Sequence, residues 1–207
     1  MGLFDLLLPA RCPVCAALGP APCDECIAEL PPPPALPPPP GLDACHAAVG
    51  YRDGGRALVA ALKFTGARGS LPWVATELAA RIRAEGLDVV TWVPTTPAHR
   101  RRRGVDQAES VARTVAAHLH LPARALLRRL PGPLQAGRGA AERRIGPPLM
   151  ARGTVPAGVL IVDDVITTGG SVAAAARELR RAGATTVVAA AIARTPPRRE
   201  LGHRHGA

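Results

Sequence analysis

Aromatic side chains are scarce in this chain. They make up 2% of its 207 residues, as two tryptophans, one tyrosine and two phenylalanines. The hydrophobic core must therefore be built mainly from alanine, valine, leucine and isoleucine. Proteins that bind single-stranded nucleic acid tightly stack the bases on aromatic side chains. The composition therefore argues against direct, tight binding of that kind.

Lysine is nearly absent as well. Lys63 is the only lysine among the 26 Lys and Arg residues, and the formal net charge is +10. That charge suits an anionic partner, either a phosphate-rich small molecule, nucleic acid or a membrane surface. Heavy use of Ala, Gly and Pro alongside arginine points to coding bias as much as to function. A single lysine suggests a need for a compact point charge, in a phosphate contact or in a structural ion pair.

Long apolar runs are missing too. No stretch approaches the roughly 18 apolar residues of a membrane span. The short apolar run before Pro9 follows no basic residues, unlike a secretory signal, and Leu6 stands where a myristoylation motif has Ser or Thr. We therefore expect a cytoplasmic protein with no membrane partner. In a reducing compartment, cysteines are more often metal ligands or free thiols than disulfides.

Four of the five cysteines form two matched pairs, CPVC and CDEC, separated by seven residues. Each Cys-x-x-Cys turn can direct two thiolates at one ion, and two turns complete a tetrahedral zinc site. The alternative is a set of redox-active or free thiols. Zinc would supply on the order of 10 kcal/mol of folding free energy to a segment too small for its own core. The predicted ligands of this structural Zn²⁺ are Cys12, Cys15, Cys23 and Cys26.

A run of prolines, PPPPALPPPP at residues 31–40, follows this segment. Serial proline holds the backbone extended and cannot join the interior of a sheet, so we expect a semi-rigid spacer rather than a ligand for proline-binding modules. Cys45, just beyond it, is expected to be a small core residue. The predicted organisation is a four-cysteine zinc-binding module at 1–30, a proline-rich linker at 31–42, an α/β domain at 43–196 and a basic tail at 197–207.

Strand and helix patterns alternate from about residue 43. This order makes a parallel sheet with helices on both faces, so the chain is predicted to have a Rossmann-like α/β fold. Ligands of such sheets bind at the carboxyl ends of the strands. Strands are expected at 46–52, 87–94, 158–164 and 185–193, with a further candidate at 123–130. Helices are expected at 54–66, 71–86, 106–120 and 171–184.

The stretch VLIVDDVITTGGSV, residues 159–172, joins a buried strand to the start of a helix. The first turn of a helix offers unpaired backbone N–H groups and a partial positive charge, and glycines let the backbone approach a phosphate. Hydroxyl side chains beside the glycines add further donors. The stretch therefore predicts a phosphate-binding loop. Its residues are Thr167, Thr168, Gly169, Gly170 and Ser171.

Asp163 and Asp164 end the strand just before this loop. Carboxylates repel a phosphate, but they suit the vicinal hydroxyls of an adjoining sugar, held directly or through Mg²⁺. Together with the loop, they predict a site for a phosphorylated sugar. The alternative is that the two acids merely end the strand and cap a turn.

These residues resemble the phosphoribosyl-pyrophosphate (PRPP) motif of type I phosphoribosyltransferases. The rest of the chain resembles the ComF (competence protein F) branch of that family. The resemblance rests on the cysteine pairs, YRDGGRALVAALKFTG, VPTTPAHRRRRGVDQAE and PLQAGRGAAERR, in that order, and it covers most of residues 1–195. It implies a type I phosphoribosyltransferase fold, PRPP bound with Mg²⁺, and an unidentified acceptor.

The resemblance also implies residue roles. Asp163 and Asp164 would hold the ribose hydroxyls at the catalytic centre, and the loop from Thr167 to Ser171 would hold the 5′-phosphate. The turn beginning at Thr95 and Thr96 would be the pyrophosphate-side loop. Lys63 is included as a candidate PRPP contact.

Two further segments complete the implied site. Arg103 belongs to the RG-x-x-Q element, within four successive arginines that could meet a diphosphate or form a solvated charge run. Gln135 and Arg143 lie in a Gly-, Pro- and Arg-rich segment, either a lid over PRPP or a plain surface loop. The chain departs from the family where Val105 and Asp106 replace an aromatic residue and asparagine, and where Gly146 replaces a frequent asparagine.

Two functions of different class remain open at this point. The first is an enzyme that transfers the phosphoribosyl group of PRPP to an acceptor. The second, also implied by the ComF resemblance, is a non-catalytic accessory of DNA uptake that acts with single-stranded DNA or a helicase-like partner. The intact acidic pair and phosphate loop favour retained PRPP binding.

Overall fold

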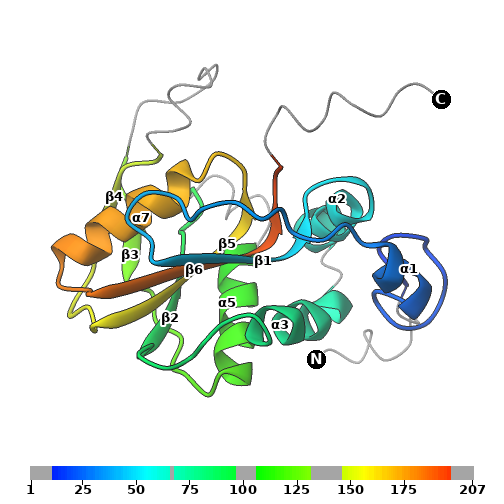
Figure 1. Ribbon diagram of the computed structural model, residues 1–207, viewed down its shortest axis with the longest axis horizontal. Coiled ribbons are helices and arrows are strands. Elements are labelled where there is room, and N and C mark those ends of the chain that lie inside the picture. Colours follow the sequence, from blue (N-terminus) through cyan, green and yellow to red (C-terminus); the bar gives the residue numbers. More distant parts are fainter. Residues whose placement is uncertain (1–10, 66–67, 97–105, 132–145, 197–207) are drawn as a thin grey trace.

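A four-stranded parallel sheet forms the centre of the computed structural model, which describes residues 11–65, 68–96, 106–131 and 146–196 (Figure 1). The strands lie in the order β1-β6-β5-β2. Both faces of the sheet are covered, which explains the continuous apolar runs of the two central strands. The predicted α/β fold is confirmed. The strands are β1 (Ala44–Gly50), β2 (Val89–Trp92), β5 (Gly158–Ile166) and β6 (Thr186–Arg194).

One face of the sheet packs on three helices, and the other packs on one helix and a small ribbon. The first layer contains α2 (Asp53–Ala60), α3 (Leu71–Ala79) and α5 (Gln107–His118). The second contains α7 (Gly170–Arg181) and the antiparallel pair β3 (Leu127–Arg129) and β4 (Leu149–Ala151). In Figure 1, α7 lies above the sheet and α3 and α5 lie below it, whereas α2 lies beyond its right-hand end.

Strand β5 sends alternate side chains into these two layers. Leu160 and Val162 pack in the core beneath α3 and α5, whereas Val159 and Ile161 pack in the core beneath α7. Because side chains alternate along a strand, the two acids that follow leave the sheet on opposite faces. Asp163 therefore lies on the side of α7, and Asp164 lies on the side of α2, α3 and α5.

The sequence locates these strands and helices well but misses some of their ends. The helix expected at 71–86 ends at Ala79, and Gly86, with φ +78°, stands in the turn before β2. The helix expected at 54–66 is α2 followed by a π-helical turn, η2 (Ala61–Thr65). A short 3₁₀ turn, η3 (Arg68–Ser70), precedes α3.

The N-terminal segment packs against the end of the sheet near α2. It contains the short helix α1 (Asp24–Glu29). If Gly54 carried a Cβ, that atom would lie 3.0 Å from Leu30 Cδ2 and 3.4 Å from Val14 Cγ1. The close approach shows that this segment rests directly on the first turn of α2.

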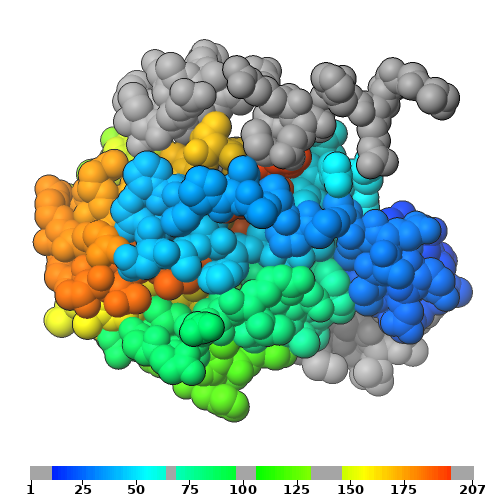
Figure 2. Space-filling view, viewed as in Figure 1, coloured from blue at the N-terminus to red at the C-terminus, as the bar shows by residue number. Residues whose placement is uncertain are grey.

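The proline-rich residues 31–40 form no helix or strand and lie across the domain surface, as Figure 2 shows between α1 and α7. The Gly50 N–H donates to the Pro31 carbonyl at 2.7 Å. The buried Arg194 guanidinium donates to the carbonyls of Leu36 at 3.0 Å and Pro37 at 2.6 Å. Proline carries a backbone carbonyl but no N–H group, so the segment needs donors from elsewhere, and the domain supplies them to these three carbonyls.

In the part of the chain that the structure describes, every helix is too short or too polar to cross a lipid bilayer.

Candidate functional site

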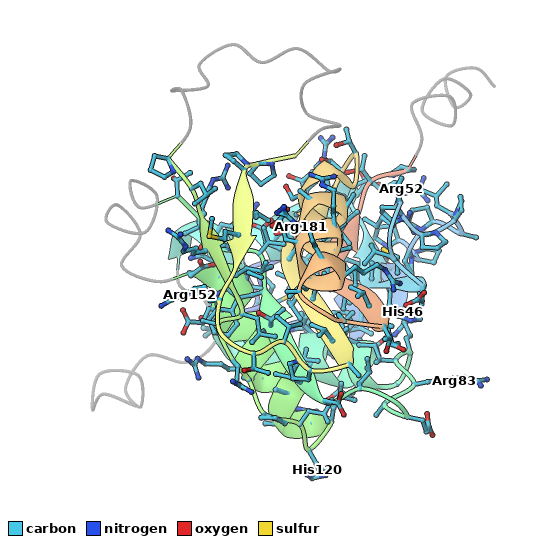
Figure 3. The ribbon with its side chains drawn as sticks, turned by 90° about the vertical axis from the view of Figure 1, so that its left-hand side faces the viewer. His46, Arg52, Arg83, His120, Arg152 and Arg181 are labelled. Atoms are coloured by element: carbon cyan, nitrogen blue, oxygen red, sulfur yellow. The ribbon has the colours of Figure 1, made fainter. Side chains whose placement is uncertain are left out.

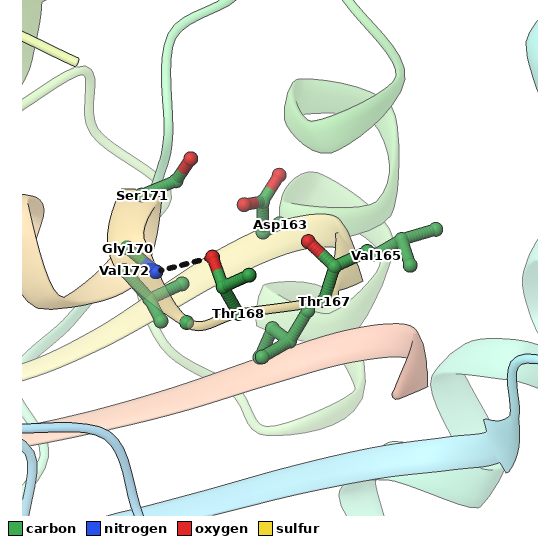
Figure 4. Close-up of a pocket in the computed structure, with 9 residues that line it drawn as sticks. Asp163, Val165, Thr167, Thr168, Gly170, Ser171 and Val172 are labelled. Atoms are coloured by element: carbon green, nitrogen blue, oxygen red, sulfur yellow. Dashed lines mark hydrogen bonds between the residues drawn. The ribbon is translucent and has the colours of Figure 1, made fainter. Parts of the chain in front are cut away.

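A cavity of about 190 Å³ lies at the carboxyl end of β5, where the chain turns into α7 (Figure 4). The lining residues are Asp163, Val165, Ile166, Thr167, Thr168, Gly169, Gly170, Ser171 and Val172. The structure therefore brings the five predicted loop residues together with the first of the two acids.

The loop is shaped by Gly169, the residue that caps the N-terminus of α7. Its φ of +78° lies in the left-handed region that favours glycine. The Gly170 N–H lies 3.4 Å from Thr168 Oγ1, a long contact that a ligand oxygen could replace. The first turn of α7 thus directs backbone N–H groups and its positive dipole end at the cavity.

Asp163 is the carboxylate of the cavity, and its ionisation is disfavoured. Burial raises the pKa of Asp163 well above its usual value, and the negative charges of Asp164 and Asp106 raise it further. The Asp164 N–H, which donates to Asp163 Oδ1 at 2.8 Å, and the positive charge of Lys63 both lower it. A bound cation or a hydroxyl donor would offset this desolvation, so the position suits either of them.

Asp164 leaves the strand on the opposite side and forms an ion pair with Lys63. The Lys63 Nζ lies 2.7 Å from Asp164 Oδ2, and both side chains are partly buried. The other carboxylate oxygen accepts the Val165 N–H at 2.6 Å. The structure thus places Lys63 on an acid of the predicted sugar site.

Thr95 follows β2, and its backbone is tied to the start of α5. The Asp106 carboxylate, 5% exposed, accepts the Thr95 N–H at 3.0 Å with Oδ2 and the Ala108 N–H at 3.1 Å with Oδ1. Burial raises the pKa of Asp106, and these N–H groups partly offset that rise. The sequence shows Asp106 only as a departure from the family, and it does not predict the bond to the Thr95 N–H, because the two residues are eleven positions apart.

Three predicted site residues, Arg103, Gln135 and Arg143, lie outside the described residues. Their roles stay predictions. The chain that follows the second of these segments lies near the cavity: a Cβ on Gly146 would approach the Gly170 carbonyl oxygen to 2.1 Å. Gly146, the first described residue after this segment, therefore lies directly against Gly170 of the phosphate loop.

The four N-terminal cysteines meet at one point, with all four Sγ atoms within 4.8 Å of one another. Two thiolates on one zinc ion at about 2.3 Å each lie roughly 3.8 Å apart in a tetrahedral site, and Cys15 Sγ lies 3.7 Å from Cys23 Sγ. The residues therefore fit a metal ion such as zinc. The set combines the buried Cys12 and Cys26 with the more exposed Cys15 and Cys23.

Backbone donors favour the thiolate of Cys12, whereas burial and the neighbouring sulfurs raise the pKa of Cys26. Burial raises the pKa of Cys12, but N–H groups of Cys15, Cys23 and Val14 outweigh it and lower the pKa to about 6. A thiol that ionises this readily is a good metal ligand at neutral pH, since metal binding requires the thiolate. Cys45 lies apart on β1, partly buried against the core beneath α7, and burial raises its pKa.

Comparison with protein families gives a match over most of the domain. The model of the phosphoribosyl transferase domain matches residues 67–205. The chain belongs to the phosphoribosyl transferase domain family. The match covers the phosphate loop, the acidic pair and the segment after β2. The cavity at the start of α7 thus lies in the part of this chain that the family model matches.

Two solved structures resemble this phosphoribosyl transferase domain. A purine phosphoribosyltransferase from Pyrococcus horikoshii Ot3 is 21% identical, over 59% of this chain and 71% of that one, with a TM-score of 0.40. The glutamine PRPP amidotransferase from B. subtilis, complexed with ADP and GMP, is 27% identical, over 67% of this chain and 28% of that one, with the same TM-score. The search of curated proteins gives no match.

Proposed function

We propose that the protein binds PRPP together with Mg²⁺ and transfers its phosphoribosyl group to an acceptor. The observation that carries this proposal is the cavity in which the N-terminus of α7, three hydroxyl side chains and Asp163 converge. The N-terminus of α7 and the hydroxyl side chains can donate hydrogen bonds to a phosphate, and the Asp163 carboxylate can accept one from a sugar hydroxyl. Membership of the phosphoribosyl transferase domain family supports the same ligand.

The reaction would break the bond between C1 of the ribose and the pyrophosphate, and the acceptor would then bond to C1. The protein's task is to hold the sugar and stabilise charge as the bond breaks. The loop from Thr167 to Ser171 would bind the 5′-phosphate, and Asp163 and Asp164 would orient the ribose. Thr95 and Thr96 would bind on the pyrophosphate side, and Mg²⁺ bound with the substrate would supply charge neutralisation for the leaving group.

We place the protein in the ComF branch on its sequence motifs, and we propose zinc as the metal of the four cysteines. The accessory role in DNA uptake is the weaker candidate, since the matches above bring no support for a DNA or helicase partner. In Figure 3, the labelled Arg52, Arg83, Arg152 and Arg181 lie on different parts of the molecule rather than in one stripe.

The deciding experiment is calorimetric titration of the purified protein with PRPP, with and without Mg²⁺. We expect a Mg²⁺-dependent Kd on the order of 1–100 μM, in the range of ordinary substrate affinities. Asp163→Asn/Asp164→Asn should weaken binding by at least about 100-fold, because each charged hydrogen bond contributes about 1.5–3 kcal/mol.

The matched control is Glu77→Gln/Glu178→Gln, which removes two carboxylates paired with Arg81 and Arg181 on other parts of the surface. It should bind PRPP normally. If the unmodified protein does not bind PRPP, the proposed function is wrong. If it binds, release of pyrophosphate in the presence of candidate acceptors tests whether transfer occurs.

A further inference from the structure

The single lysine of the chain occupies an irregular point in the fold. It lies in η2, where α2 widens for one π-helical turn before the chain leaves the helix. Such turns are rare and are frequently found at functional sites. Here the π-helical turn brings Lys63 to the carboxyl end of β5, where Asp164 receives it.

Both carboxylate oxygens of Asp164 have a partner, one in Lys63 and the other in the backbone. Lys63 Nζ contacts Oδ2 at 2.7 Å, and the Val165 N–H donates to Oδ1 at 2.6 Å. The side-chain exposures of Lys63 and Asp164 are 20% and 25%, so water competes only weakly for the contact. The carboxylate is therefore fixed in one orientation before any ligand arrives.

A lysine fits this position better than an arginine. The Asp164 carboxylate already has a backbone partner on one oxygen, so only one oxygen remains for a cation. The ammonium is a compact charge with three donors, whereas the guanidinium is a planar fork suited to both oxygens at once. The chemistry of the contact thus accounts for lysine in a chain that otherwise uses arginine.

The position of Lys63 also separates it from the phosphate. Lys63 is not among the residues that line the cavity, and Asp164 is not among them either. The acid lies one residue beyond Asp163 and on the other face of β5, so under the proposed function it is left to the sugar and not to the 5′-phosphate. Lys63 therefore acts on the sugar end of the site.

We propose that Lys63 is a positioning residue: it fixes Asp164 for a ribose hydroxyl and has no direct part in binding the 5′-phosphate. This inference rests on the proposed function and extends it to a residue outside the phosphate loop. The carboxylate keeps lone pairs free beside the ammonium contact, so a sugar hydroxyl can donate to it without displacing Lys63.

The test compares two ligands that differ only in the sugar. Inorganic phosphate occupies the loop alone, and ribose 5-phosphate adds the hydroxyls. Lys63→Met keeps most of the unbranched side chain and removes the ammonium group and its charge. In calorimetry, the substitution should raise the Kd of ribose 5-phosphate by at least tenfold and change the Kd of inorganic phosphate by less than twofold.

Two further variants sharpen the result. Arg181→Met removes one positive charge at the far end of α7, about 16 Å from Gly170 at 1.5 Å per helical residue, and should leave both affinities unchanged. Asp164→Asn should weaken the binding of ribose 5-phosphate as much as Lys63→Met does. Combining the two substitutions should lower the affinity little further. That non-additivity is the signature of a residue that acts through another.

Each remaining outcome overturns the inference in a different way. Equal losses for both ligands would make Lys63 a phosphate contact. Normal binding of both by a folded Lys63→Met protein would make the ion pair purely structural. If the unmodified protein binds phosphate but gains nothing from the ribose, the proposed function fails and the inference fails with it.

Discussion

Gly169 and Gly86 have the same backbone φ in different surroundings. Both have φ of +78°, where a residue with a side chain costs about 1–2 kcal/mol. A Cβ on Gly86 would meet no atom within 4 Å, whereas a Cβ on Gly169 would lie 2.6 Å from Pro39 Cγ. The pair therefore separates backbone strain from steric contact at the phosphate loop.

We expect Gly86→Ala to lower the free energy of unfolding by about 1–2 kcal/mol, and Gly169→Ala to lower it by about 1–3 kcal/mol more, the usual cost of overpacking. Urea denaturation measures both. Inorganic phosphate should bind Gly86→Ala normally and Gly169→Ala weakly. Equal destabilisation of the two variants would show that Pro39 yields and does not constrain the loop.

The same reasoning explains a position that the sequence marked only as unusual. Gly146 stands where the family often has asparagine. Its φ is +76°, and a Cβ there would lie 2.1 Å from the Gly170 carbonyl oxygen and 2.9 Å from Ala174 Cβ. No asparagine fits without moving α7. The residue type was visible in the sequence, but its reason is a contact with a helix whose position the sequence does not specify.

At the scale of the secondary-structure elements, Asp106 couples the segment after β2 to α5. Asparagine at this position could cap α5 with its carbonyl oxygen, but its amide group would then face the Thr95 N–H, which is also a donor. We expect Asp106→Asn to lower the free energy of unfolding at pH 7 by about 1–3 kcal/mol, the cost of a buried donor without an acceptor.

Chemical denaturation checks this value. The matched control is Glu109→Gln, an acid-to-amide change in the first turn of α5 at an i,i+4 ion pair with the exposed Arg113, which should cost no more than about 0.5 kcal/mol. PRPP affinity should fall in Asp106→Asn, since Thr95 loses its anchor. A variant as stable as the unmodified protein would mean that the carboxylate does not need to accept both N–H groups.

Local patterns predicted the main elements for physical reasons, and they failed where distant contacts decide. The run from Gly158 to Ile166 is a central strand because both of its faces are buried. Strand β4 has three residues, too few for a periodic signal, and its partner β3 is about twenty residues earlier in the chain. The ion pair of Lys63 depends on a π turn, and no sequence rule places one.

At the scale of the whole molecule, the proline-rich segment connects the cysteine cluster to the phosphate loop through three contacts. Pro31 bonds Gly50 at the end of β1, Arg194 holds the middle of the segment, and Pro39 packs against Gly169. Serial prolines transmit displacement well because their backbone is stiff. Arg194, 7% exposed at the end of β6, is the point that fixes the segment to the sheet.

This arrangement predicts what removal of zinc does. The purified protein should contain one zinc per chain, and a zinc-selective chelator should lower the melting temperature and raise hydrogen exchange in residues 11–35. Without the metal, the small segment around α1 has little core of its own. Exchange in α5, which lies on the far side of the domain from the prolines, should not change.

Phosphate binding should survive this treatment, because Arg194 still holds the carbonyls of Leu36 and Pro37 and so keeps Pro39 against Gly169. The Kd of inorganic phosphate, a ligand that needs no Mg²⁺, should change by less than about twofold after chelation. Since a tenfold change corresponds to about 1.4 kcal/mol, such a change is small in binding free energy. In the Arg194→Met variant, the same chelation should weaken the binding of inorganic phosphate several-fold. Unchanged exchange would argue against a structural metal, and lost phosphate binding in the unmodified protein would show that the cysteine cluster acts on the loop past Arg194.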